Sequence, residues 1–443
     1  MIGEDPSAMS ITSPGFKPRR LSYNLTRSTR VDIALLVCAL FLQRFNLFFP
    51  GGNHKVVSLS LVSAVLIFVH QFVCGRLVIQ YDRLLWFLLL ALAATSSVLL
   101  NFNISSLNSY GLFLVLYFFL TFRRPSTAHQ YRTTLNGFQF LMLILCSLAI
   151  MQFPAQFVVD PRRLLMFFGI FPTSILPYDY VAGVNTLGIV GAAGLTRANG
   201  IFLNEASTLS QMAAFAILIE ILEFHRPRYL IVLTIGFLLA YGGTGVSVLL
   251  ISLPLAFIHN RRAQLPLLLV GLFAAGLFAT GVIDLSAFTS RVDEFQSTGT
   301  GALGTGGSGF VRFVSPLWEA ADYLRIASLT GFLCGNGPGY GGIHTLYEAS
   351  TNTWFKLFLE YGLVGALVFT CFLGACFRRS RCPMPLIVGI VYCYLFTGNA
   401  LLDPSTLIII AVLCSLNGPE LALAPLAKLT PTRSTSAIAS PAS

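Results

Sequence analysis

The chain has 443 residues, of which 55% are hydrophobic and only 10% are charged. Soluble globular domains carry about 25% charged residues, so this chain has too few charges to cover a soluble surface of its size. Its mean hydropathy of +0.76 agrees. The composition predicts an integral membrane protein and excludes a soluble enzyme, a nucleic-acid-binding protein and a wholly disordered chain.

The apolar residues fall into runs that alternate with short polar segments. Residues 1–30 come first and are polar, without the apolar core of a signal peptide, so we expect a cytoplasmic tail. A run of about 20 residues can cross ~30 Å of hydrocarbon as a helix. We expect twelve transmembrane helices, near 31–49, 56–74, 84–100, 109–122, 138–158, 207–223, 229–241, 244–258, 265–283, 353–376, 384–401 and 404–417.

The distribution of cations tests this topology. Lys and Arg number 28 against 18 acidic residues, a net charge of +10, and cytoplasmic loops of membrane proteins collect Lys and Arg. With both termini cytoplasmic, the inner segments hold 19 of these cations and the outer segments eight, while Arg44 lies within the first span. The excess therefore favours an even number of spans and this orientation.

Two long loops interrupt the pattern, and both fall on the outer side, at about 159–206 and 284–352. Loops of this length in a compact protein are usually functional or disordered. The second contains a Gly-rich stretch and then Val311–Ala327, which has helical periodicity. We expect one polytopic transmembrane domain over residues 31–417, followed by a disordered cytoplasmic tail over 418–443.

The first polar motif leads into the sixth span and reads Arg197-Ala-Asn-Gly200-Ile-Phe-Leu-Asn204-Glu205-Ala-Ser207. Gly200 permits a tight turn, Asn204 or Ser207 can cap the helix, and Glu205 in the first turn suits the helix dipole. A helix N-terminus beside Arg197 attracts an anion such as phosphate. The alternative is a well-capped helix with an interfacial arginine that reaches toward water.

The second polar motif contains His344, Asn352 and Glu360, and it leads into the tenth span. His344 is a natural proton acceptor near neutral pH, or else a loop histidine without a role. Glu360 lies eight residues beyond Asn352, so about 12 Å into the membrane at the helical rise, where an acid is a functional candidate. Its structural alternative is an ion pair with Lys356, one turn above.

Two further arginines, Arg291 and Arg312, flank the Gly-rich stretch of the second outer loop. Phosphate-bearing ligands need more than one cation, so these residues are candidate partners of Arg197. They can also be ordinary loop charges. No paired acids or His/Asp cluster suggests a metal, and we expect neither a metal nor a cofactor.

Together the two motifs resemble those of the bacterial O-antigen polymerase and ligase superfamily. Arg197–Ser207 is similar to its Arg-x-x-Gly-x-Phe-x-(Asn/Glu) element. Asn352, followed by Leu359-Glu-Tyr-Gly-Leu-Val-Gly365, resembles its second element. The sequence departs from the family pattern in two places, because Thr351 rather than His precedes Asn352 and Tyr241–Gly245 carries no cation.

The resemblance implies an all-α, GT-C-like membrane glycosyltransferase that works at the periplasmic face of the inner membrane, without a metal, on undecaprenyl-diphosphate-linked oligosaccharides. Arg197 would bind the diphosphate, and His344 or Glu205 would act as the base. Asn204, Gly200, Asn352 and Glu360 would belong to the substrate site with Arg291 and Arg312. A chain-length co-polymerase is a candidate partner, and nucleic acid is not.

Three functions therefore remain open at this stage. The first is a polymerase of exopolysaccharide or O-antigen repeat units, which we prefer. The second is a ligase of the same superfamily, which would join finished glycan to lipid A or protein. The third is a twelve-span transporter or flippase, although such proteins usually show repeated halves and ionisable groups at mid-membrane.

Overall fold

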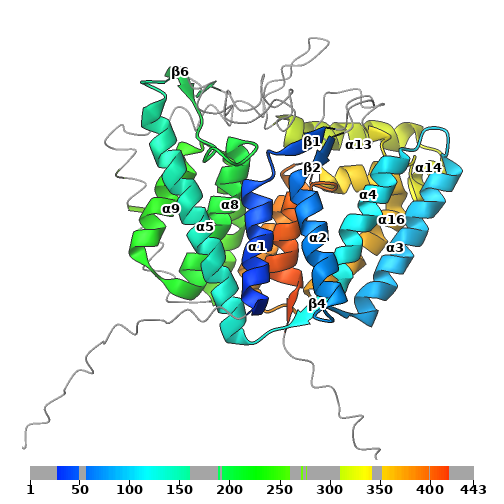
Figure 1. Ribbon diagram of the computed structural model, residues 1–443. Coiled ribbons are helices and arrows are strands. Elements are labelled where there is room, and N and C mark those ends of the chain that lie inside the picture. Colours follow the sequence, from blue (N-terminus) through cyan, green and yellow to red (C-terminus); the bar gives the residue numbers. More distant parts are fainter. Residues whose placement is uncertain are drawn as a thin grey trace, which may run out of the picture.

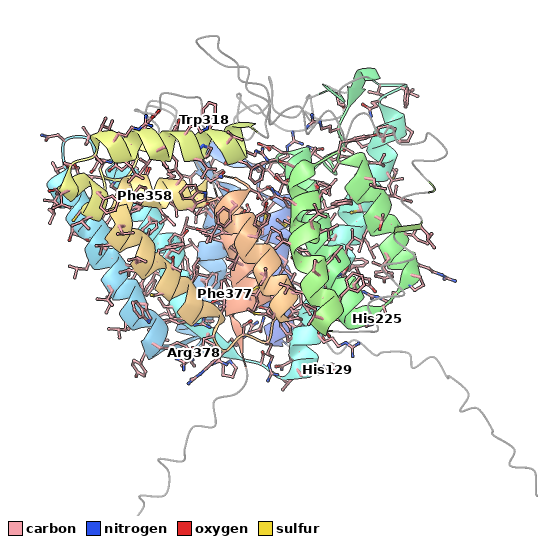
Figure 2. The ribbon with its side chains drawn as sticks, turned by 180° about the vertical axis from the view of Figure 1, so that it is seen from behind. His129, His225, Trp318, Phe358, Phe377 and Arg378 are labelled. Carbon is pink, nitrogen blue, oxygen red and sulfur yellow. The ribbon has the colours of Figure 1, made fainter. Side chains whose placement is uncertain are left out.

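The computed structural model describes residues 27–48, 56–159, 188–189, 192–259, 271–272, 276, 310–341, 352–398 and 400–418. Within these residues the protein is a bundle of roughly parallel helices, with one helix lying across one end (Figures 1 and 2). Of the predicted tails 1–30 and 418–443, residues 1–26 and 419–443 lie outside the described residues, as do most of both predicted outer loops. Helix α1 begins at Arg27, within the range predicted as the N-terminal tail.

The helices of the bundle are α1 (Arg27–Phe41), α2 (Leu59–Val73), α3 (Tyr81–Leu100), α4 (Leu107–Phe118), α5 (Ala128–Ala155), α8 (Ala206–Ile219), α9 (Pro227–Leu239), α10 (Gly243–His259), α16 (Thr353–Phe377), α17 (Met384–Phe396) and α18 (Pro404–Ile410). Short 3-10 or π segments extend three of them, namely η1 (Phe119–Thr121), η3 (Glu220–Phe224) and η6 (Ala411–Ser415). Eleven of the twelve predicted ranges thus overlap a described helix, with boundaries that differ by up to ten residues, and the ninth, 265–283, falls almost wholly outside the described residues.

Four of the described helical stretches are long and apolar enough to cross a membrane: Tyr81–Leu100, Ala128–Ala155, Ala206–Phe224 and Thr353–Phe377. Six shorter apolar helices accompany them. Large apolar side chains also remain exposed on α2 and α3, for example Leu66, Val73 and Leu92. Such a surface is consistent with a protein embedded in a membrane, where hydrocarbon covers the apolar perimeter.

The structure adds short strands that the all-α prediction did not include. The hairpin β1 (Asn46–Phe48) and β2 (Val56–Ser58) joins α1 to α2, while β5 (Gly188–Ile189) and β6 (Ala192–Thr196) pair ahead of α8. At the opposite end, β4 (Phe122–Pro125) lies between antiparallel β3 (Val78–Ile79) and parallel β7 (Asn417–Gly418). These strands are connections between helices, so the architecture stays helical.

The two ends of the bundle differ in charge. We name them the α13 end, after α13 (Ser315–Ile326) and its neighbour α14 (Leu329–Cys334), and the β4 end (Figure 1). Of the 17 described Lys and Arg residues, twelve lie at the β4 end and five at the α13 end. Both the start of α1 and strand β7 are at the β4 end, where Asp32 forms an ion pair with Arg124 and accepts a hydrogen bond from Asn417.

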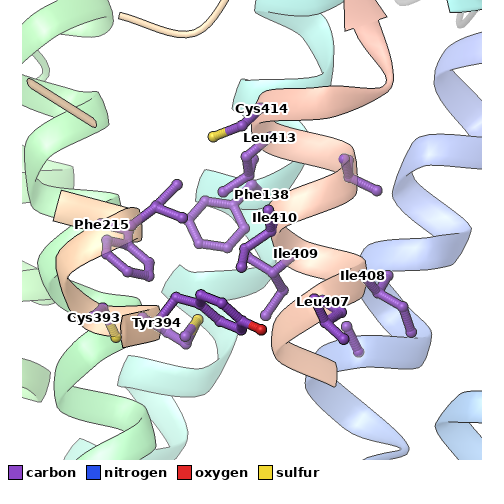
Figure 3. Close-up of a cluster of buried hydrophobic side chains, with 14 of the residues drawn as sticks. Phe138, Phe215, Cys393, Tyr394, Leu407, Ile408, Ile409, Ile410, Leu413 and Cys414 are labelled. Atoms are coloured by element: carbon purple, nitrogen blue, oxygen red, sulfur yellow. The ribbon is translucent and has the colours of Figure 1, made fainter. Parts of the chain in front are cut away.

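The core forms where α8, α5, α17 and α18 meet, because their apolar residues cover most of each helix surface. Phe138, Phe215 and Tyr394 pack there against the run Leu407–Ile410 (Figure 3). From Leu209 onward every residue of α8 except Gln211 is buried, whereas α2 and α3 bury one face only. Helix α8 is therefore surrounded by other helices over most of its length, and its less buried first turn lies at the α13 end.

Candidate functional site

The first motif forms a tight turn held by α5. Gly200 and Ile201 both have positive φ angles, +68° and 69°. The Gln152 side-chain oxygen accepts the N–H groups of Asn199, at 3.2 Å, and Gly200, at 3.1 Å. The Asn199 amide in turn donates to the Leu203 carbonyl at 2.8 Å. The turn that the sequence predicted at Gly200 is present, and these bonds pre-organise it.

Gly200 offers a direct test of this turn. A Cβ atom at this position would lie 2.8 Å from the Leu145 carbonyl oxygen, and the φ angle of +68° is unfavourable for alanine. Gly200→Ala should therefore destabilise the protein by about 2 kcal/mol or more and lower its apparent melting midpoint in detergent. Gly111→Ala is the matched control, because nothing lies within 4 Å of a Cβ there. Equal midpoints for the two variants would contradict the assigned turn geometry.

The start of α8 differs from the prediction that Asn204 or Ser207 caps it. Glu205 is the N-cap residue, and its side chain makes no capping hydrogen bond. Ser207 already lies inside the helix and donates its hydroxyl to Glu205 Oε2 at 2.7 Å. Asn204 precedes the cap position by one residue. The Glu205 carboxylate is therefore free of the helix backbone and turns toward other groups.

Arg312 connects the two motifs. It belongs to the π segment η5 (Phe310–Val314), which leads into α13. Its guanidinium lies 3.3 Å from Glu205 Oε2, and its carbonyl oxygen accepts a hydrogen bond from the side chain of Asn352. Asn352 is the N-cap residue of α16. Glu205, Arg312 and Asn352 thus meet at the α13 end although they are far apart in the chain, and we call them the Arg312 cluster.

The Arg312 cluster is polar but only partly open. The side chains of Arg312 and Glu205 are 19% and 34% exposed, and Asn352 is buried. The Asn352 side-chain oxygen makes no hydrogen bond to any described residue. A group entering the cluster would therefore meet a guanidinium and a carboxylate, while the unused amide oxygen of Asn352 is buried.

Polar residues that the sequence did not single out form hydrogen bonds next to the Arg312 cluster, at the start of α16. Thr353 Oγ1 donates to the Gly398 carbonyl at 3.2 Å and accepts the Ala400 N–H at 3.1 Å. Gln211 of α8 donates to Thr397 Oγ1 at 3.2 Å. Thr353 thus fixes the start of α16 to the connection between α17 and α18, and Gln211 fixes α8 to Thr397 at the start of the same connection. No sequence pattern points to them, because each one joins distant segments.

Two more arginines belong to this region, one within the first motif and one beside it. Arg197 is half-buried, and its Nε–H is buried without a hydrogen-bond partner among the described residues. Arg44 donates to the Ile201 carbonyl. Because α1 ends at Phe41, Arg44 lies beyond the helix at the α13 end rather than within the span predicted for it. Burial lowers the pKa of Arg44 to about 10, so this guanidinium stays charged at neutral pH. An arginine inside an apolar run was the available signal for it.

Glu360 does not join the Arg312 cluster within the described part of the chain. It is fully buried, 4.0 Å from Lys356, and its Oε1 accepts the Gly339 N–H at 2.9 Å. Its backbone carbonyl accepts from Ser97 Oγ at 2.6 Å. The α16 backbone breaks at Gly362, whose φ is +69°. These contacts favour the ion-pair alternative and make Glu360 an anchor for the loop before α16.

Two predicted site residues, His344 and Arg291, lie outside the described residues, as does the Gly-rich stretch. The described residues contain no group of three His, Cys, Asp or Glu side chains that could hold a metal ion. What they do bring together is the Arg312 cluster, with one arginine, one carboxylate and one amide. Arg197 and Arg44 lie at the same end of the bundle, in and beside the turn of the first motif. This arrangement can hold an anion and accept a proton. No family model and no curated protein matches the chain. The functional argument therefore rests on these residues and on the resemblance of the two motifs.

Proposed function

We propose that the protein polymerises exopolysaccharide or O-antigen repeat units at the periplasmic face of the bacterial inner membrane. The growing glycan on undecaprenyl diphosphate is the donor, and the next lipid-linked repeat unit is the acceptor. One observation carries this proposal: Arg312 pairs with Glu205 and accepts from Asn352, so the two motifs of the family resemblance share one site.

The proposed orientation follows from charge. Cations collect on the cytoplasmic side of membrane proteins, and the β4 end holds twelve of the 17 described Lys and Arg residues. With the β4 end in the cytoplasm, the Arg312 cluster faces the periplasm. The first and last described elements lie together at the β4 end, which suits an even number of crossings and the proposed count of twelve.

In the proposed reaction, a hydroxyl oxygen of the acceptor sugar attacks the anomeric carbon of the donor. The bond from that carbon to the diphosphate oxygen breaks, and undecaprenyl diphosphate leaves with the electron pair. A single displacement of this kind inverts the anomeric configuration. The hydroxyl proton passes to Glu205 or to His344.

The arginines supply the electrostatic part of catalysis. Negative charge develops on the departing diphosphate, and we assign Arg312 and Arg197 to stabilise it, while Arg44 holds the turn of the first motif. Removing one such donor typically costs about 10²–10³ in rate. Glu205 already faces a guanidinium at 3.3 Å, so a diphosphate entering the site would share Arg312 with it and leave the carboxylate available to the attacking hydroxyl.

Reconstitution tests the function. The purified protein in proteoliposomes, supplied with undecaprenyl-diphosphate-linked repeat units and a chelator, should lengthen the glycan and release undecaprenyl diphosphate. Long glycan transferred only when lipid A is added would instead identify a ligase. Movement of the intact lipid-linked unit across the bilayer without a change in glycan length would identify a flippase. Either of these results would overturn the polymerase assignment.

A further inference from the structure

A groove between α1 and α2 lies at the β4 end, far from the Arg312 cluster. The two helices run side by side in Figure 1. The groove has a volume of about 460 Å³. Its lining combines apolar side chains with cations: Arg30, Val31, Ala34, Leu66, Ile67, His70, Gln71 and Arg76. The proposed glycan transfer uses none of these residues.

The polar side of the groove is positively charged. Arg30 lies exposed in the first turn of α1, and Arg76 follows the end of α2. The Nη1 atom of Arg76 is buried without a hydrogen-bond partner among the described residues. None of the lining residues is acidic. The nearby Asp32 is buried and already engaged with Arg124, so its charge does not offset the groove.

The apolar side of the groove continues into a surface that suits lipid chains. Leu66 and Ile67 line the groove, and Leu66 is 64% exposed. On the same helix Val69 and Phe72 are exposed too, and Val73 is 78% exposed. A soluble anion would not require this apolar wall, whereas an acyl chain would cover it. The cations lie at the end of the apolar face, where a headgroup would sit at the membrane surface.

We propose that the α1–α2 groove binds one anionic phospholipid of the leaflet at the β4 end. Its phosphate lies between Arg30 and Arg76, and an acyl chain follows Leu66 and Ile67. The bound lipid fills the space between the first two helices and neutralises two cations that have no acidic partner in the groove. This site requires the protein to lie in a bilayer but does not depend on the transfer reaction.

Native mass spectrometry of the detergent-purified protein tests the site with added phosphatidylglycerol and, separately, phosphatidylcholine. The wild type should retain phosphatidylglycerol preferentially. Each cation near an anionic headgroup contributes roughly fivefold in affinity, so Arg30→Gln and Arg76→Gln should each weaken this binding by about that factor. Arg228→Gln is the matched control, because Arg228 is an exposed arginine at the same end, on α9, outside the groove.

A second variant distinguishes binding within the groove from general attraction of anionic lipid to a positively charged surface. Ala34→Trp keeps both arginines but fills the groove, and it should reduce phosphatidylglycerol binding as strongly as the charge variants. Binding in Arg30→Gln equal to that in Arg228→Gln would overturn the site, and so would equal retention of the two lipids by the wild type. Displacement of phosphatidylglycerol by millimolar inorganic phosphate would show a soluble-anion site instead. Arg30 is exposed, so Arg30→Gln stays informative even if Ala34→Trp fails to fold.

Discussion

Arg197→Ala should abolish polymer while single lipid-linked repeat units accumulate. The Nε–H of Arg197 is buried and has no hydrogen-bond partner among the described residues. This nitrogen can therefore donate to a diphosphate without first giving up a hydrogen bond to one of those residues. Its removal takes away one cation that stabilises the leaving group, at a cost of about 3–4 kcal/mol in the barrier and 10²–10³ in rate. Gel analysis of glycan length in cells that carry the variant measures the effect.

The control for Arg197→Ala is Arg325→Ala. Arg325 lies at the same α13 end, but its side chain is 79% exposed and, among the described residues, pairs with Asp322 of its own helix at 3.4 Å. This variant should make polymer of normal length. Immunoblots of the membrane fraction establish that both variants accumulate equally. Normal chain length in Arg197→Ala at wild-type abundance would remove Arg197 from the site.

Arg83→Ala should prevent the protein from accumulating in a folded form. Arg83 is fully buried in α3, and its guanidinium makes five hydrogen bonds at 2.8–3.3 Å. Its acceptors are the carbonyls of Leu120, Phe122, Cys376 and Ser415 and the Ser415 hydroxyl. Each buried acceptor left without a donor costs about 1–3 kcal/mol, so the total exceeds what most single substitutions cost.

The comparison for Arg83→Ala is Arg378→Ala, an exposed arginine at the same β4 end (Figure 2). Gel filtration in detergent and the apparent melting midpoint measure both variants. We expect Arg378→Ala to behave as the wild type, and Arg83→Lys to fall between the two, because one ammonium cannot reach all five acceptors. A folded Arg83→Ala with an unchanged midpoint would show that Arg83 does not join α3 to α16 and η6.

Arg83 and Arg44 show where sequence reasoning reached its limit. Both were counted by their position relative to the membrane, Arg83 as an inner cation and Arg44 as a residue within a span. The structure buries Arg83 as a donor to carbonyls from three segments and brings Arg44 to the first motif. Side-chain burial depends on which segments meet, and composition does not contain that information.

For the candidate site too, the sequence named residues and the structure decided which of them meet. From the sequence, Arg197, Glu205, Arg312, Asn352 and Glu360 were all candidate members, with Arg197 as the expected diphosphate-binding residue. The structure joins Glu205, Arg312 and Asn352, and it assigns Glu360 to Lys356 and the loop at Gly339. A loop has no regular periodicity, so its sequence does not indicate which residue a loop arginine will contact. Arg312 was therefore one candidate among several, and only the fold shows that it contacts Glu205.

The sequence by itself indicated a helical protein of membrane-like composition, the approximate positions of eleven described helices and the separation of cations between two ends. These properties depend on apolar length, local backbone preference and charge counts, which are read residue by residue. Only the tertiary structure decided that Glu205 begins α8 facing Arg312, because that ion pair joins residues 107 positions apart. It also decided that α1 and α2 leave a cationic groove, since a groove exists only where two helices pack.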